Sequence, residues 1–198
     1  MNTFNPSVIS RRVTLSADFY AGDTVGVARL MLGAWLVRRL EDGRLLAGRI
    51  VETEAYLPGD PAMHGFRGRT ARNAPLFGPP GSSYVYFIYG MYYCFNVVTQ
   101  PEGIAAAVLI RGLDQIADAN GPGRICRVMQ LDLSHNGLDL TSKASDVFIV
   151  SGEQLTEPVI TTTRIGITKN ADPLWRFYVA GSPGVSKRDR KAERAAGL

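Results

Sequence analysis

The sequence predicts a single α+β domain: a mostly antiparallel, curved β-sheet with an open-barrel-like core, a few surrounding helices and a protruding β-hairpin. Strand signals outnumber helix signals, and turn sequences join several of the strands as hairpins. A chain of 198 residues with 45% hydrophobic content can bury one large core. Because no repeat or linker divides it, we expect one domain over 1–198, with mobile ends at 1–14 and 186–198.

The first predicted elements are a helix and a β-hairpin. Asp23 is suited to cap the helix, and Gly33 is suited to end it. Strands are expected at 34–40 and 45–54. The Asp-Gly sequence within 41–44 predicts the hairpin turn between them.

A long loop, a second hairpin and several shorter elements are predicted next. Residues 57–83 are rich in Pro and Gly, and a loop of this length in a compact domain is usually functional or disordered. Strands at 84–88 and 92–98 form a hairpin that turns at residues 89–90. The other predicted elements are strands at 105–111, 147–150, 159–167 and 174–180, and a helix over 121–131 that Pro122 opens.

Composition restricts the location and the partners of the protein. No apolar run approaches the roughly 20 residues of a membrane span, so no membrane partner is expected. Two cysteines make a disulfide framework improbable and indicate a reducing compartment, hence the cytoplasm, or the nucleoid of a bacterium. A net charge of +4, carried mainly by arginine, permits a polyanionic partner but equally suits a solvated surface. The basic tail after Ser186 is more typical of a solvated terminus than of a DNA-binding arm.

Two glutamates near the end of an apolar strand are the first candidates for chemistry. The two-residue period of a strand places Glu52 and Glu54 on one face with Leu46 and Ile50. The strand could simply emerge into solvent there. Alternatively, a half-buried carboxylate at this position could act as a general base toward water in a cleft. Spacing alone leaves both interpretations open.

Tyrosines form the second unusual pattern, because five of the eight fall between Tyr84 and Tyr93. Aromatic residues favour strands in any protein, which accounts for part of the cluster. Tyr84 and Tyr86 share one strand face, and inward-facing rings of this kind suit stacking on an extruded base. Tyr89 is expected to be exposed at the hairpin turn, where a ring suits insertion between base pairs.

Other common chemistries lack their sequence patterns. Histidines and cysteines have no paired metal-ligand spacing, and His64 in the loop is, taken alone, more typical of a structural or solvated residue. A phosphate-binding glycine loop, a dinucleotide fingerprint and a nucleophile elbow are all missing from the sequence. We therefore expect neither a metal nor a cofactor. Three classes remain: a base-excising enzyme, a module that stacks single-stranded bases, and a carbohydrate hydrolase using both glutamates.

A series of short motifs runs along the chain in a consistent order. They are VETEAYL at 51–57, His64, RGRT at 67–70, FGPPG at 77–81, YVYFIYGMY at 84–92, CFN at 94–96, VLIR at 108–111, Gly121-Pro122, RFYV at 176–179 and GSP at 181–183. Over roughly residues 15–186, this series resembles the alkyladenine (3-methyladenine) DNA glycosylase family. The resemblance implies a DNA repair enzyme that flips alkylated or deaminated purines out of duplex DNA and hydrolyses the N-glycosidic bond, leaving an abasic site.

The resemblance also assigns roles to residues. It implies that Glu54 is the general base, that Arg111 helps to hold the attacking water, and that Glu52 has a structural or supporting role. It further implies a base-binding set of Tyr56, His64, Tyr86 and Asn96. Of these, Tyr56, His64 and Tyr86 sandwich the flipped base, and Asn96 disfavours the 2-amino group of guanine.

The expected partner is double-stranded DNA containing damaged purines, bound by a monomer. The resemblance implies that Tyr89 fills the gap that the flipped base leaves, and the loop arginines Arg67, Arg69 and Arg72 are candidates for phosphate contacts. No lysine precedes Lys143, so the block with the proposed site contains no amine for a Schiff base. We therefore expect a monofunctional glycosylase without lyase activity.

Overall fold

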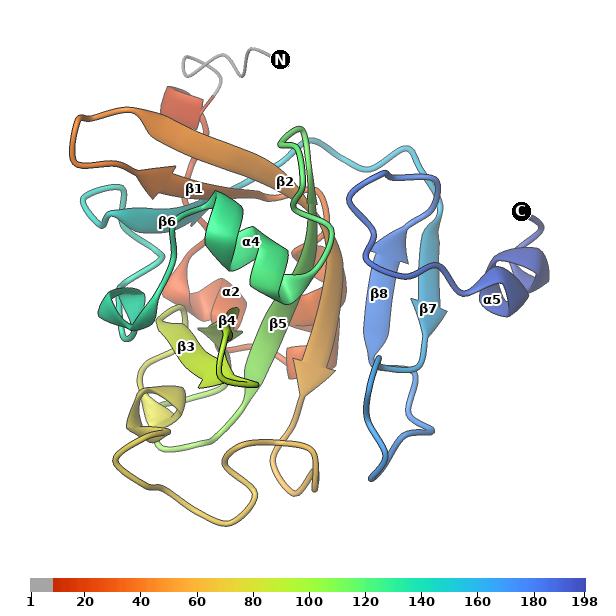
Figure 1. Ribbon diagram of the computed structural model, residues 1–198, viewed down its shortest axis with the longest axis horizontal. Coiled ribbons are helices and arrows are strands. Elements are labelled where there is room, and N and C mark those ends of the chain that lie inside the picture. The colour runs from red at the N-terminus through yellow and green to blue at the C-terminus, as the bar shows by residue number, and fades with distance from the viewer. Residues whose placement is uncertain (1–8) are drawn as a thin grey trace.

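The computed structural model describes residues 9–198 as a curled eight-stranded antiparallel sheet with short helices around it (Figure 1). Its strands are β1 (Trp35–Arg39), β2 (Leu45–Tyr56), β3 (Ser83–Ile88), β4 (Tyr92–Val98), β5 (Ala107–Asp114), β6 (Val147–Val150), β7 (Val159–Thr162) and β8 (Arg176–Val179). The main strand order is β3-β4-β5-β2-β1-β6; in addition, β8 pairs with β2, and β7 pairs with β8. The predicted α+β class is confirmed.

Short helices connect and cover the strands. They are the α-helices α2 (Ala17–Tyr20), α3 (Thr24–Leu30), α4 (Pro122–Val128) and α5 (Arg190–Ala195), and the 3₁₀ helices η1 (Ala74–Phe77) and η2 (Leu133–His135). As predicted, Asp23 caps α3, and its carboxylate accepts a hydrogen bond from the Gly26 amide at 2.8 Å. Pro122 occupies the first turn of α4, which packs against β4 and β5 and crosses in front of them in Figure 1.

Strand β2 organises the sheet because it is long enough to pair with three neighbours. Its first half pairs with β1, and its second half pairs on the same edge with β8 at residues 52–54. The other edge pairs with β5 from Arg49 to Tyr56. Residues of three separate chain segments therefore meet around the second half of β2.

Residues near both chain ends contact the sheet. Ile9 is buried and Thr14 forms a bridge with Val150, while residues 1–8 of the predicted N-terminal tail lie outside the described range. At the other end, the tail forms α5, and its buried Glu193 accepts a hydrogen bond from the Tyr178 hydroxyl at 3.1 Å. Glu193 thus satisfies a buried hydroxyl of β8, while most other residues of the tail are exposed.

A glycine pair brings the C-terminal segment onto the sheet. A Cβ atom at Gly112 of β5 would lie only 2.3 Å from the Gly184 carbonyl oxygen, and one at Gly184 would lie 2.2 Å from the Leu113 carbonyl oxygen. Neither position has room for a side chain, so the two backbones pack directly against each other. Two residues further along the chain, Ser186 lies within hydrogen-bond distance of Glu52.

Two loops frame the site. The segment between β2 and β3 is the long loop that the sequence predicts, interrupted only by η1, and it runs along the lower edge of the molecule in Figure 1. The strand predicted over 159–167 is too long, since β7 ends at Thr162 and a loop continues to β8. No helix in residues 9–198 is long and apolar enough to cross a membrane.

Candidate active site

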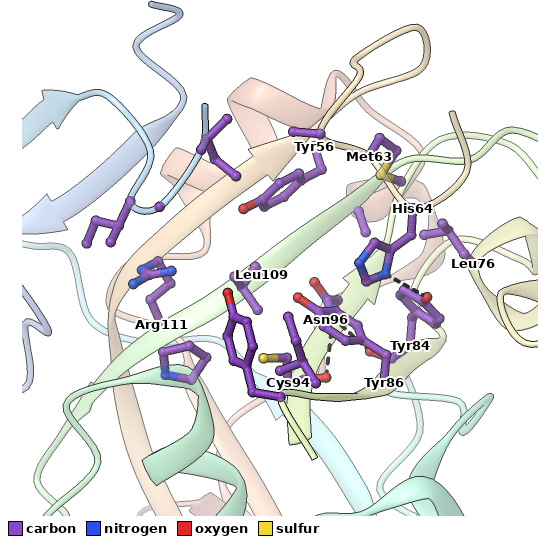
Figure 2. Close-up of a pocket in the computed structure, with 18 residues that line it drawn as sticks. Tyr56, Met63, His64, Leu76, Tyr84, Tyr86, Cys94, Asn96, Leu109 and Arg111 are labelled. Carbon is purple, nitrogen blue, oxygen red and sulfur yellow. Dashed lines mark hydrogen bonds between the residues drawn. The ribbon is translucent and has the colours of Figure 1, made fainter. Parts of the chain in front are cut away.

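A cavity of about 340 Å³ opens between β2, the β3–β4 hairpin, the 57–82 loop and the loop after β7 (Figure 2). Its walls are mainly aromatic and aliphatic. Six of the predicted site residues line it: Tyr56, His64, Tyr86, Tyr89, Asn96 and Arg111. The structure thus brings together positions that lie up to 55 residues apart in the chain.

Glu54 lies directly beneath this cavity. Its side chain is fully buried, more so than the half-buried position expected, and its three hydrogen-bond donors all belong to cavity-lining residues. The Ile165 amide donates to Oε1 at 2.7 Å, while the Tyr56 hydroxyl and Arg111 Nη1 donate to Oε2 at 2.9 and 3.3 Å. Burial raises the pKa of Glu54, although Arg111 and the two other donors act in the opposite direction. The carboxylate is therefore held in one orientation next to the cavity.

Two β-bulges between β2 and β5 change the direction of the side chains around Glu52. The β2–β5 register shifts on both sides of Glu52, and Val51 and Arg111 are the additional residues. Bulges re-aim side chains and often occur next to active sites. The shifts interrupt the alternation by which Ile50 was expected to share a face with the glutamates. Ile50 packs in the main core, whereas Arg111 reaches both carboxylates, at 3.4 Å for Glu52 and 3.3 Å for Glu54.

Glu52 connects three segments of the chain. Besides Arg111, its buried carboxylate accepts hydrogen bonds from Arg176 Nη1 of β8 at 2.7 Å and from the Ser186 amide at 2.6 Å. Two guanidinium groups and two glutamates thus form a charge-balanced cluster in the protein interior. Because a buried charge that loses its partner is strongly unfavourable, Glu52 keeps Arg111 and Arg176 paired.

Aromatic rings form the walls of the cavity. Figure 2 shows Tyr56 across the cavity from His64 and Tyr86. The His64 ring packs against Tyr86 with centroids 4.2 Å apart, and its Nδ1 lies 3.0 Å from the Tyr84 hydroxyl. Partial burial and the nearby Arg72 lower the pKa of His64, which favours the neutral imidazole. Tyr84, to which the resemblance assigned no role, contacts this histidine and helps to orient its ring.

Asn96 lies on β4 and is buried in the wall. Its amide nitrogen donates to the carbonyl oxygens of Tyr84 at 3.0 Å and Cys94 at 3.4 Å. Both N–H bonds are therefore engaged with the backbone. The group that remains for a bound molecule is the side-chain carbonyl oxygen, an acceptor.

Tyr89 projects from the tip of the β3–β4 hairpin, as the sequence predicts. Its side chain is 82% exposed and it also forms part of the cavity mouth. Tyr89 and Gly90 both have positive φ angles, 54° and 69°, and a left-handed conformation is uncommon for a residue as large as tyrosine. The turn geometry thus holds an apolar ring in solvent next to the cavity.

The three loop arginines, Arg67, Arg69 and Arg72, are exposed on the segment that borders the cavity. Arg72 donates to the Phe87 carbonyl oxygen at 2.8 Å, which connects this loop to the hairpin. A residue that the sequence did not reveal, Asn73, stabilises the loop through its amide, which donates to the His64 carbonyl oxygen at 2.9 Å. This contact connects Asn73 to the backbone of His64.

The loop after β7 contributes residues that the sequence interpretation missed. The Ile165 amide contacts Glu54, and the buried Arg164 guanidinium stacks over the ring of Tyr56, 4.6 Å from its centroid. The available signal in the sequence was Gly166, because a glycine inside a strand pattern weakens the prediction of a regular strand. Within residues 9–198, His, Cys, Asp and Glu side chains form no group of three that could hold a metal ion.

Comparisons with known proteins identify the family of the chain. The family model described as methylpurine-DNA glycosylase matches residues 18–119 and 115–183. Relatives whose names contain the words 3-methyladenine DNA glycosylase occur in several organisms. One from Synechococcus elongatus is 51% identical, with 82% of this chain and 86% of the relative covered. Others are from Carboxydothermus hydrogenoformans, at 44% identity with 88% and 99% covered, and Rickettsia felis, at 45% with 86% and 96% covered.

The fold, the buried carboxylate beside an aromatic cavity and the family match together define the class of the protein, a hydrolytic DNA N-glycosylase. Within that class, the chain belongs to the methylpurine-DNA glycosylase family.

Proposed function

We propose that this protein excises alkylated and deaminated purines from duplex DNA, with Glu54 activating the water that hydrolyses the N-glycosidic bond. The observation that carries the proposal is the position of Glu54: a buried carboxylate whose donors Tyr56, Arg111 and Ile165 all line an aromatic cavity. A module that only binds nucleic acid gains nothing from a carboxylate there, because it lowers the affinity for phosphates.

The cavity suits one extruded base. Its volume of about 340 Å³ is at the small end of the range for ligand sites, about 300–1,000 Å³, which favours a single nucleobase over an oligosaccharide. A base between Tyr56 and the His64–Tyr86 wall would gain stacking energy of about 1–3 kcal/mol per ring. Electron-rich rings also attract the positive charge of an alkylated purine. The bulk of Asn96, whose free group is an acceptor, opposes a 2-amino substituent by shape rather than by donor repulsion.

Hydrolysis then requires an ionised general base near the sugar of the flipped nucleotide. A carboxylate has about four acceptor positions, and Glu54 uses three, which leaves capacity for the proton of a water molecule. Arg111 holds the same carboxylate oxygen as Tyr56 and counteracts the effect of burial on the Glu54 pKa. As the purine departs with the electron pair of the N-glycosidic bond, the Glu54 carboxylate stabilises the oxocarbenium-like sugar and accepts a proton from the attacking water.

Duplex DNA is the proposed partner because of the surface around the cavity mouth. The exposed ring of Tyr89 would occupy the gap left by the flipped base, and the exposed side chains of Arg67, Arg69 and Arg72 would contact phosphates. All of these residues come from one chain, so we expect a monomer. Because its substrate is DNA, we expect it to act in the compartment that holds the chromosome. We also propose that the enzyme leaves the abasic strand intact.

Base release from defined duplexes tests the proposal. Duplexes with one 7-methylguanine, hypoxanthine or ethenoadenine are incubated with the protein, and the freed base is separated by chromatography. Release of at least one base, with strand breaks only after alkali, is expected. No release from any of the three, by protein that is folded and binds DNA, would contradict the proposal.

A further inference from the structure

A buried cation lies behind one wall of the cavity. The guanidinium of Arg164 lies over two aromatic rings, with its Cζ atom 4.6 Å from the Tyr56 centroid and 5.0 Å from the Trp175 centroid. Tyr56 lines the cavity, whereas the Arg164 side chain is fully buried and does not line it. The guanidinium therefore covers the ring face that is turned away from the cavity.

Hydrogen bonds keep this guanidinium in place. Nη1 donates to the Ala55 carbonyl oxygen at 3.1 Å and to the Asp60 carboxylate, and Nη2 donates to the Asn170 carbonyl oxygen at 3.2 Å. Asp60 is itself fully buried and accepts a second hydrogen bond, from the Asn170 side chain, at 3.2 Å. Because hydrogen bonds hold both terminal nitrogens, the planar guanidinium cannot rotate away from the Tyr56 ring.

Arg164 affects the ring of Tyr56 through its charge as well as through its shape. A cation is attracted to the electron density of an aromatic face. When a guanidinium already occupies one face, it draws that density toward itself and repels a second cation on the opposite face. Among the cavity-lining rings of the described structure, a guanidinium covers Tyr56 alone.

We propose that Arg164 is a positioning residue that determines specificity: it fixes the ring of Tyr56 and makes the cavity face of that ring less attractive to a cationic base. The preference of the cavity for alkylated, cationic purines is then weaker, so neutral lesions compete better for binding. This inference rests on the proposed function, since it concerns the choice among bases that Glu54 would release.

Other charges near the ring modify the effect. Asp60 partly compensates Arg164, while Glu54 and Arg111 face the hydroxyl end of Tyr56. Removing the charge of Asp60 alone leaves the positive charge of Arg164 uncompensated. Neutralising both Asp60 and Arg164 removes that positive charge. The two changes should therefore move selectivity in opposite directions.

The test uses Asp60→Asn and the double variant Asp60→Asn/Arg164→Gln, in which both side chains keep polar groups for hydrogen bonding. Single-turnover rate constants are measured for release of 7-methylguanine and of hypoxanthine from the same duplex. We expect the ratio of the cationic to the neutral base to rise about three- to tenfold in the double variant, and to fall in Asp60→Asn. The ratio does not depend on the folded fraction of a preparation.

Arg29→Gln is the matched control, because Arg29 lies over the ring of Phe177 at 6.0 Å and neither residue lines the cavity. Its ratio should equal that of the wild type. Equal losses of both rate constants in the double variant, with an unchanged ratio, would overturn the inference and leave Arg164 as a structural residue. A wild-type protein that releases neither base would instead refute the proposed function itself.

Discussion

Replacing Glu54 with Gln separates the chemistry of the site from its structure. The amide has the shape of the carboxylate, and its oxygen can still accept the Ile165 amide, now 2.7 Å from Oε1. Its NH₂ group would then face the Tyr56 hydroxyl, which can reverse its role and accept. Arg111 loses one partner and keeps Glu52. The walls of the cavity should therefore persist.

The expected effect on catalysis follows from the loss of the proton acceptor. General-base catalysis contributes about 10²–10⁴ in rate, so single-turnover base release should fall by that factor. Affinity for lesion DNA should change by only a few fold, because Glu54 lies beneath the cavity and the stacking rings remain. Both quantities are measurable on one labelled duplex, by base release and by anisotropy.

Glu153→Gln is a suitable control, since Glu153 is an exposed carboxylate that pairs with Arg12 at 2.9 Å. It should release bases at the wild-type rate. Comparable turnover by Glu54→Gln and the wild type would refute the assignment of the general base. Glu52, the other buried carboxylate paired with Arg111, would then be the next residue to replace.

The same variant predicts a stability effect with a definite sign. Burial raises the pKa of Glu54 in the folded protein above its ordinary value, so the folded state binds this proton more tightly than the unfolded chain. This contribution to stability is present at low pH and is lost as pH rises through the folded pKa. Gln does not titrate, so the free energy of unfolding of the variant minus that of the wild type should increase with pH. Denaturant titrations at several pH values above the ordinary carboxyl range test this, and a decrease would contradict it.

Three further predictions concern the reaction and its DNA substrate. Base release should decline on the acid side with a midpoint above 4.5, the ordinary pKa of a glutamate, because Glu54 must be ionised; a midpoint at or below that value in a pH–rate profile would argue against Glu54. Tyr89→Ala should reduce release from a duplex much more than from a single strand, where no gap is filled, and equal losses would mean that the ring has another role. Borohydride added during turnover should trap no protein–DNA adduct, since no lysine of the described chain lines the cavity. An adduct that disappears on replacing a lysine would refute the monofunctional mechanism.

Much of the scaffold was predictable because its signals are local. Asp23 caps a helix through an amide three residues away, and the Asp-Gly turn joins β1 to β2. The exposed Tyr89 followed from its place at a hairpin turn. The resemblance of the motifs also identified the family and six residues that line the cavity.

Contacts between distant segments were decided by the tertiary structure. Ile165 reaches Glu54 across 111 positions, and Ser186 reaches Glu52 across 134, so neither contact leaves a periodic pattern in the chain. The predicted strand over 159–167 failed for the same reason. A run rich in β-branched residues suits a strand, but Arg164 lies in a loop, buried against Asp60 and Tyr56.

Burial of the two glutamates is the clearest example of a feature that the tertiary structure decides and the local sequence does not. Strand periodicity could place Glu52 and Glu54 on one face, but it could not say whether that face is solvated. The answer depends on a bulge at Arg111 in another strand, which supplies a cation to both carboxylates. A buried carboxylate is tolerated only when such a partner is present, and only the packed sheet brings the partner there.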